Sequence, residues 1–174
     1  MKKGIIQIYT GNGKGKTTAS VGLAVRARAH GLRVFYIQLF KDPLFHAGET
    51  KLFKKLGIGY KNFVKKHPCY LSNYNLNNII KEVSKSINYL SKLLSSNKYD
   101  LIVFDEVNIA LRDKLLSLDK LKHVLKDKPK GVEVVLTGRS APRELIKLAD
   151  LVTGMKELKH PFKSGLLCRK GIEY

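Results

Sequence analysis

The 174-residue sequence predicts an α/β protein in which a doubly wound, mostly parallel sheet lies between two layers of helices. Continuous apolar runs rich in Val and Ile, typical of strands buried on both faces, alternate with stretches whose apolar residues follow helical spacing. Several of these runs end in polar or charged residues, where open α/β sheets bind their ligands. With 44% hydrophobic residues, the chain is long enough for one well-buried domain, which we expect to span residues 1–174.

The first element is a glycine-rich loop between a strand and a helix. Residues 4–8 (GIIQI) are a strand-type run, and residues 19–30 are helix-prone. Between them, backbone N–H groups and the positive end of the helix can together bind an anion. Lys16 can then reach the outer phosphates of a nucleotide, and Thr17 can hold Mg²⁺ through its hydroxyl. The predicted phosphate-binding residues are Gly11, Asn12, Gly13, Lys14, Gly15, Lys16, Thr17 and Thr18.

The spacing of this loop departs from the usual pattern, G-x-x-x-x-G-K-[ST]. If Gly15, Lys16 and Thr17 close the pattern, its first glycine falls on Thr10, and counting from Gly11 leaves the loop one residue short. The dinucleotide pattern G-x-G-x-x-G also fails, because Lys16 occupies its third glycine position. The spacing therefore allows a phosphate pose that differs from the usual one.

The next strand is predicted at residues 32–40 (LRVFYIQLF), a continuous apolar run. Residues 41–49 contain Pro and Gly and predict a loop that leaves the C-terminal end of this strand. A short helix is expected at 50–56. Glu49 is equally well interpreted as a functional carboxylate or as the charge at the start of that helix.

The stretch that follows, residues 60–74, is aromatic and basic and predicts a short strand and a surface loop. Within it His67 has no partner at metal-ligand spacing, so we expect it to face solvent. Residues 77–94 then place apolar side chains at helical spacing, which predicts an amphipathic helix packed on the sheet.

A second chemical landmark is YDLIVFDE, residues 99–106. Its apolar residues predict a buried strand that carries two carboxylates, Asp105 and Glu106, to its C-terminal tip. Beside a phosphate loop, this pattern is typical of the acids that serve Mg²⁺ in nucleotide enzymes, although a strand that simply ends in solvated acids is the alternative. We expect Asp105 to bind magnesium through water or to act as a structural acid, and Glu106 to lie nearer the nucleotide; the sequence leaves this division open.

Arg139 follows the next strand-type run, residues 131–137. At the tip of that strand it is positioned to clamp a phosphate or to pair with Glu106, and a surface charge is the alternative interpretation. The remaining elements are predicted as a helix or turn at 108–111, a helix at 115–125, a short helix opened by 141–144 and a last short strand at 150–155.

Composition narrows the range of functions. The net charge of +19, from 33 Lys and Arg against 14 Asp and Glu, favours polyanionic partners. The lysines are nevertheless spread along the chain, and no recognisable RNA- or DNA-binding module accompanies the densest run, 51–66, so nucleic acid is the less favoured partner. Cys69 and Cys168 lie too far apart for a zinc or disulfide motif. No apolar run approaches a membrane span and no signal sequence precedes the first strand, so we expect a cytoplasmic protein.

Several segments together resemble one enzyme family. The resemblance rests on residues 10–31, on IQLFK followed by Gly48-Glu49, on DLIVFDEVNIAL at 100–111, on VVLTGRSAP at 134–142 and on residues 149–174. In these segments the chain resembles the corrinoid (cob(I)alamin or cob(I)yrinic acid a,c-diamide) adenosyltransferases of the P-loop type.

This resemblance implies a recombinase-type P-loop fold, usually a homodimer, which binds MgATP and presents its ribose to a reduced corrinoid. Cobalt(I) attacks C5′ and triphosphate leaves, with a flavin or flavodoxin-type partner as the expected reductant. Residues 11–17 would hold the phosphates of an ATP that lies reversed relative to ordinary P-loop enzymes, Thr17 and Glu106 would serve Mg²⁺, and Thr18 and Arg139 would support the nucleotide. Lys16, Glu106 and Arg139 are the implied catalytic residues.

The middle of the chain departs from that family. Family members share a Phe-Thr-Trp sequence near the corrin ring, whereas this chain has YKNFVK at 60–65 and no Trp. Tyr60 and Phe63 are candidates either for apolar caps below the cobalt or for core packing. Two other classes of function stay open at this point: a basic P-loop ATPase that acts on nucleic acid, and a small-molecule kinase.

Overall fold

The computed structural model describes residues 3–41, 48–68 and 75–173. Its strands form one six-stranded, fully parallel sheet in the order β3-β2-β4-β5-β1-β6. The strands are β1 (Ile6–Thr10), β2 (Val34–Gln38), β3 (Gly59–Asn62), β4 (Leu101–Asp105), β5 (Glu133–Thr137) and β6 (Leu151–Gly154). The helices are α1 (Lys16–Ala29), α2 (Gly48–Leu56), α3 (Leu76–Ser95), α4 (Val107–Arg112), α5 (Leu118–Lys126), α6 (Arg143–Leu148) and the short 3₁₀ helix η2 (Pro161–Ser164).

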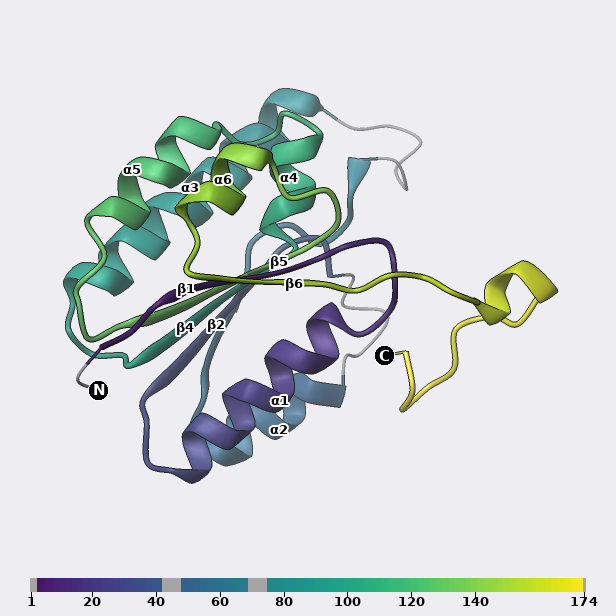
Figure 1. The fold of residues 1–174 in the computed structure, drawn as a ribbon, viewed down its shortest axis with the longest axis horizontal. Helices are drawn as coiled ribbons and strands as arrows, with labels where there is room; N and C mark the ends of the chain where they lie inside the picture. Colours follow the sequence, from purple (N-terminus) through teal and green to yellow (C-terminus); the bar gives the residue numbers. More distant parts are fainter. Residues whose placement is uncertain (1–2, 42–47, 69–74, 174) are drawn as a thin grey trace.

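Helices cover both faces of this sheet. Helices α1 and α2 lie on one face, and α3, α4, α5 and α6 lie on the other (Figure 1). Parallel strands need crossover connections, and helices that alternate with strands supply them. The structure thus confirms the predicted three-layer α/β fold with a parallel sheet. The predicted loop 41–49 and surface loop 60–74 lie partly outside the described residues, as does Cys69.

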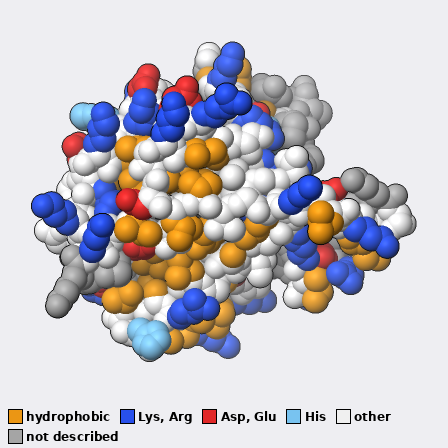
Figure 2. Space-filling model, viewed as in Figure 1, with side chains coloured by type: hydrophobic (Ala, Val, Ile, Leu, Met, Phe, Trp, Pro, Cys, Tyr) orange, Lys and Arg blue, Asp and Glu red, His pale blue; other side chains and the backbone are white. Residues whose placement is uncertain are grey.

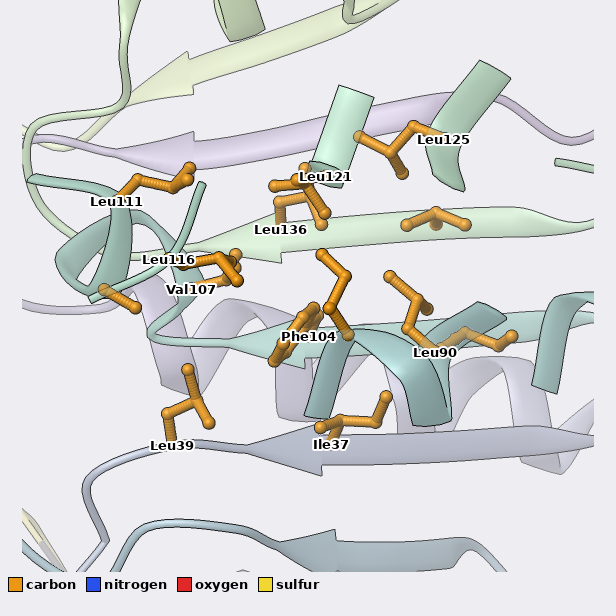
Figure 3. Packing of buried hydrophobic residues seen from close by; sticks show 14 of the residues in the cluster. Ile37, Leu39, Leu90, Phe104, Val107, Leu111, Leu116, Leu121, Leu125 and Leu136 are labelled. Atoms are coloured by element: carbon orange, nitrogen blue, oxygen red, sulfur yellow. The ribbon is translucent and has the colours of Figure 1, made fainter. Parts of the chain in front are cut away.

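Two apolar layers hold the sandwich together. On the α3 side, Ile37, Phe104 and Leu136 of the sheet pack against Leu90 of α3 and Leu121 of α5 (Figure 3). Full burial of each such side chain contributes about 1.5–3 kcal/mol. All five residues of β2 and of β4 are buried, as predicted for strands covered on both faces.

The opposite layer is thinner. Ala24 and Ala27 of α1 are buried against the sheet, and their small side chains bring the helix close to Tyr36 and Val103. Phe53 of α2 is fully buried here and lies 4.9 Å, centroid to centroid, from the ring of Tyr36. Helix α1, which carries the phosphate loop at its N-terminus, is therefore fixed to the centre of the sheet.

Several predicted boundaries differ from the observed ones, and two of them have a clear physical cause. Strand β1 extends through Tyr9 and Thr10, which we assigned to the loop, because these residues pair with Thr137 of β5 and Gly154 of β6. Helix α5 begins at Leu118 rather than at residue 115, since the Ser117 side chain caps it by accepting a hydrogen bond from the backbone N–H of the third helical residue.

The prediction that His67 faces solvent was also wrong. Its side chain is only 15% exposed, its ring packs edge-on against Phe40, and its Nε2 lies 2.7 Å from Asp113 Oδ2. A neighbouring carboxylate and an aromatic ring make this position favourable for an imidazole. Near the same sheet edge, Phe63 packs against Tyr89, and Tyr60 donates from its hydroxyl to Gln38, so both aromatics serve packing in this structure.

Candidate active site

The site forms where three strands end. Strand β5 lies between β1 and β4, so the phosphate loop after β1, the tip of β5 and the acids after β4 meet at one edge of the sheet. A cleft of about 910 Å³ opens there. Its lining combines the loop, α1 and α2 with residues that follow β2, β4 and β5 and with the C-terminal tail: Gly13, Lys14, Gly15, Lys16, Thr17, Thr18, Val21, Lys41, Gly48, Glu49, Leu52, Glu106, Arg139, Glu157, His160, Cys168, Gly171, Ile172 and Glu173.

The glycines of the loop are required by its packing. Gly11 and Gly15 have φ values of 101° and 116°, which residues other than glycine rarely adopt. Gly13 donates its N–H to the carbonyl of Met155 at 2.7 Å, and a Cβ added at Gly13 would lie only 2.8 Å from that oxygen. The residues that follow β6 therefore hold the loop from outside.

Lys16 is buried and folds back on its own loop. Its ammonium donates to the carbonyls of Gly11 at 2.9 Å and Gly13 at 2.6 Å. Burial lowers the pKa of Lys16, and the charge of Glu106 opposes that shift. The loop carbonyls thus replace water around the ammonium and keep it beside the concave backbone that an anion would occupy.

Asp105 is fully buried at the tip of β4 and accepts hydrogen bonds from three elements. Thr17 Oγ1 donates from 3.2 Å, Gln38 Nε2 donates from 2.9 Å, and the Thr137 hydroxyl also donates. Burial raises the pKa of Asp105, and the hydrogen bonds from Thr137 and Gln38 oppose the rise. Both carboxylate oxygens are engaged, which is consistent with a structural acid; binding of magnesium through water stays a prediction.

Glu106 has the opposite character. It stands at the N-cap of α4 with φ 62° and without a capping hydrogen bond, while its backbone N–H donates to Thr137 Oγ1 at 3.0 Å. Its Oε2 is buried and has no hydrogen-bond partner in the described part of the chain. Burial, followed by the charge of Asp105, raises the pKa of Glu106 to about 7. A buried carboxylate oxygen without a described partner, on a residue that lines the same cleft as Thr17, suits a hard cation such as Mg²⁺.

The remaining predicted residues do not all line the cleft. Thr18 lines the cleft, whereas Asn12 lines an adjoining hollow shared with Arg139. Arg139 is exposed, and among the described ion pairs none joins it to Glu106, so that predicted pairing is not formed. Glu49 lies in the first turn of α2 and also lines the cleft, which brings together both interpretations of this residue.

The comparisons with known proteins agree with this geometry. The sequence profile of the family ATP:corrinoid adenosyltransferase BtuR/CobO/CobP matches residues 2–174. The chain belongs to this family. Corrinoid adenosyltransferases from Sinorhizobium sp, Pseudomonas aeruginosa and Escherichia coli (strain K12) are 33%, 31% and 30% identical to it, cover 99% of this chain, and are themselves covered to 81%, 85% and 87%. The resemblance inferred from the motifs is thus confirmed over the whole length.

Among solved structures, flagellar accessory protein FlaH from Methanocaldococcus jannaschii is similar, with a TM-score of 0.57 at 13% identity. The match covers 88% of this chain and 72% of that protein. At this identity the likeness concerns the fold alone, and it agrees with the recombinase-type P-loop fold that the family resemblance implies.

Within this member of the adenosyltransferase family, the C-terminal tail forms part of the site. The tail continues from β6 and returns toward the start of α1 (Figure 1). Glu173 Oε1 lies 2.7 Å from Lys14 Nζ, and Arg169 donates its backbone N–H to Glu173 at 2.7 Å. Arg169 and then Lys14 hold the pKa of Glu173 down at about 2.

Sequence reasoning missed several residues of this site, Glu173 of the tail among them. Gln38 and Thr137 are polar residues at the ends of otherwise apolar strands, and that position was the available signal. Lys41 follows β2 in the same way. Met155 carried no chemical signal, since it contributes a backbone carbonyl.

Proposed function

We propose that the protein transfers the 5′-deoxyadenosyl group of ATP to the Co(I) centre of a reduced corrinoid and releases triphosphate. The observation that carries the proposal is the match to the adenosyltransferase family over residues 2–174. The cleft supports it, because the phosphate loop, Glu106 and Arg139 line one space of sufficient size for a nucleotide.

In this reaction the electron pair of Co(I) forms the bond to C5′, and the C5′–O bond breaks with its electrons passing to the triphosphate. The nucleophile has no proton to lose, so no general base is required. The protein instead positions the two substrates and neutralises charge on the leaving group. Loop N–H groups, Lys16 and Arg139 are the groups suited to that second task.

We further propose Mg²⁺ as a partner of ATP. The Thr17 hydroxyl and the unpartnered Glu106 Oε2 are the donors that fit it, with Asp105 fixing Thr17 from below. When bound, the ion adds positive charge beside the phosphates. Lys16 approaches the same phosphates from the loop.

A homodimer and a flavin or flavodoxin-type reductant belong to the same proposal. The edge strand β6 exposes Leu151 and Val152, and the tail exposes Leu158 and Leu167, which gives a second copy apolar surface to cover. No helix among the described residues is long and apolar enough to cross a membrane. The cytoplasmic location and the single domain stay predictions.

The alternative functions have less support. On the face in Figure 2, apolar side chains occupy the middle and Lys and Arg side chains are scattered around the rim. On this face the basic side chains therefore do not form one continuous surface for nucleic acid. A kinase would transfer the γ-phosphoryl group and release ADP. The products therefore separate these classes of reaction.

The test is an anaerobic assay of the purified protein with chemically reduced cob(I)alamin and MgATP, followed by the spectrum of a light-sensitive cobalt–carbon bond and by triphosphate release. We expect both products in equal amounts. If neither forms, the assay is repeated with cob(I)yrinic acid a,c-diamide, and a second failure, or the release of ADP, would contradict the proposal.

Lys16→Ala is the matched inactive variant. It removes a principal counter-charge of the triphosphate, so we expect turnover to fall by at least about 100-fold. Because Lys16 also holds the loop through hydrogen bonds to the Gly11 and Gly13 carbonyls, the thermal unfolding midpoint of the variant is measured alongside. Unchanged turnover in a folded Lys16→Ala protein would overturn the site assignment.

A further inference from the structure

The cleft that the phosphate loop lines also carries an ion pair that the chemistry above does not use. Lys41 follows β2, Glu49 lies in the first turn of α2, and their Nζ and Oε1 atoms are 3.4 Å apart. Both side chains line the cleft, and they are only 25% and 15% exposed. The pair therefore stands where a bound nucleotide would meet it.

The position of Lys41 is set by the sheet rather than by its ion pair. Asn62, the last residue of β3, donates from its side-chain amide to the backbone carbonyl of Lys41 at 2.7 Å. One residue before the end of β2, Ile37 pairs in register with Phe104 of β4. The start of the Lys41 side chain is thus held at the strand edge, while its ammonium is free to change partner.

The charge of Lys41 affects the two acids at the centre of the site, Asp105 and Glu106. It is one of the positive charges that lower the pKa of Asp105 and of Glu106, together with Lys16 and Arg139 in the case of Glu106. Lys41 follows β2, Lys16 is the first residue of α1 and Arg139 follows β5, and all three line the same cleft.

A purely structural ion pair is the competing explanation. A half-buried pair costs much of its attraction in desolvation, so it contributes little when its only task is to join two elements. Phe53 already joins α2 to the sheet through full burial. An ion pair that lines an open cleft is better explained by a ligand that replaces one of its members.

We propose that Lys41 is a further triphosphate-binding residue of this enzyme and that Glu49 holds its ammonium until the triphosphate takes over that contact. The inference rests on the proposed function, which supplies a triphosphate both as part of the substrate and as the leaving group. Negative charge on the leaving oxygen increases as the C5′–O bond breaks, and a further cation in the cleft stabilises that charge.

The test measures equilibrium binding of inorganic tripolyphosphate with Mg²⁺, and separately of adenosine, to the full chain. We expect Lys41→Gln to weaken tripolyphosphate binding by about tenfold or more, since one charge-assisted hydrogen bond is lost, and to leave adenosine binding unchanged. Lys41→Arg should restore binding to within about threefold of the unaltered protein. Glu49→Gln should tighten tripolyphosphate binding, because it removes the competing carboxylate.

Lys51→Gln is the matched control, because Lys51 is an exposed lysine of the same helix as Glu49 and does not line the cleft. It should bind tripolyphosphate within about twofold of the unaltered protein. Thermal unfolding of each variant is recorded, and if Lys41→Gln fails to fold the expected tightening of tripolyphosphate binding by Glu49→Gln becomes the deciding comparison.

Equal tripolyphosphate binding by Lys41→Gln and the unaltered protein would overturn the inference, as would the absence of measurable binding by the unaltered protein. An equal loss of tripolyphosphate and adenosine binding would overturn it too, because it would indicate a structural role. Neither measurement requires a corrinoid. Tripolyphosphate binding that depends on Lys41 without adenosyl transfer would therefore leave this inference standing and contradict the proposed function.

Discussion

Two carboxylates hold the phosphate loop from opposite sides, and they differ in burial. Asp105 accepts from Thr17 at the bottom of the loop and is fully buried, whereas Glu173 pairs with Lys14 at the top, where the two side chains are 21% and 46% exposed. Burial raises the pKa of Asp105, while Arg169 and Lys14 lower that of Glu173 to about 2. Loss of the carboxylate should therefore be destabilising at Asp105, whereas water can take the place of the carboxylate at Glu173.

The difference shows that access of water decides how much free energy the loss of each carboxylate costs. If Asp105 is removed, three donors lose their acceptor at a place that water does not reach, and each such loss carries a desolvation cost. If Glu173 is removed, water and salt ions reach Lys14 directly. The buried side should therefore govern folding, whereas the tail side should affect mainly binding and contribute less to folding, because its charges are screened by water and salt.

The largest expected effect is that of Asp105→Ala. We expect it to lower the free energy of unfolding by about 3 kcal/mol, because Thr17, Gln38 and Thr137 are left without their buried acceptor. Urea denaturation followed by circular dichroism measures the change. Asp119→Ala, at a 92% exposed side chain of α5, is the control and should have no comparable effect. An unchanged urea midpoint in Asp105→Ala would contradict the claim that the buried carboxylate stabilises the fold more than Glu173 does.

A second effect concerns Glu106, which belongs to the buried wall. Its folded pKa is about 7, above the ordinary 4.5, so the folded state keeps a proton that the unfolded state loses. Its contribution to stability is therefore fully present below about pH 4.5 and is lost as the pH rises through about 7. Relative to the unaltered protein, Glu106→Gln should become more stable by about 1 kcal/mol or more between pH 5 and pH 8.

The tail carboxylate gives the opposite sign and sharpens that test. Because the folded pKa of Glu173 is lowered, its contribution is present above about pH 4.5 and is lost as the pH falls toward about 2. Urea midpoints of both variants are compared across pH. If the stabilities of Glu106→Gln and Glu173→Gln changed with pH in the same direction, the opposite pKa shifts assigned to the two carboxylates would be wrong.

The smallest expected effect is that of Glu173→Gln on catalysis. Removal of a negative charge beside Lys14 should lower the KM for ATP by about two- to threefold at low salt, and the difference should vanish in high salt. Steady-state kinetics at two ionic strengths measure it. A loss of turnover beyond tenfold would instead place the tail in the chemistry itself.

The sequence by itself determined the fold class, the phosphate loop and the two acids of β4. These signals are local: buried strands are continuous apolar runs, amphipathic helices have a period of 3.6, and glycines mark a loop that a Cβ would block. It also indicated the family, through motifs spread from residue 10 to residue 174.

Only the tertiary structure decided which side chains meet. Strand β5 separates β1 from β4, which brings Thr137 to Asp105, and the residues after β6 close the loop through Met155. Gln38 and Lys41 join the site because β2 lies beside β4. In a parallel sheet, neighbouring strands are separated by whole crossover helices. Local patterns therefore specify each strand tip, and the order of strands, which depends on the packing of the entire chain, specifies which tips share a site.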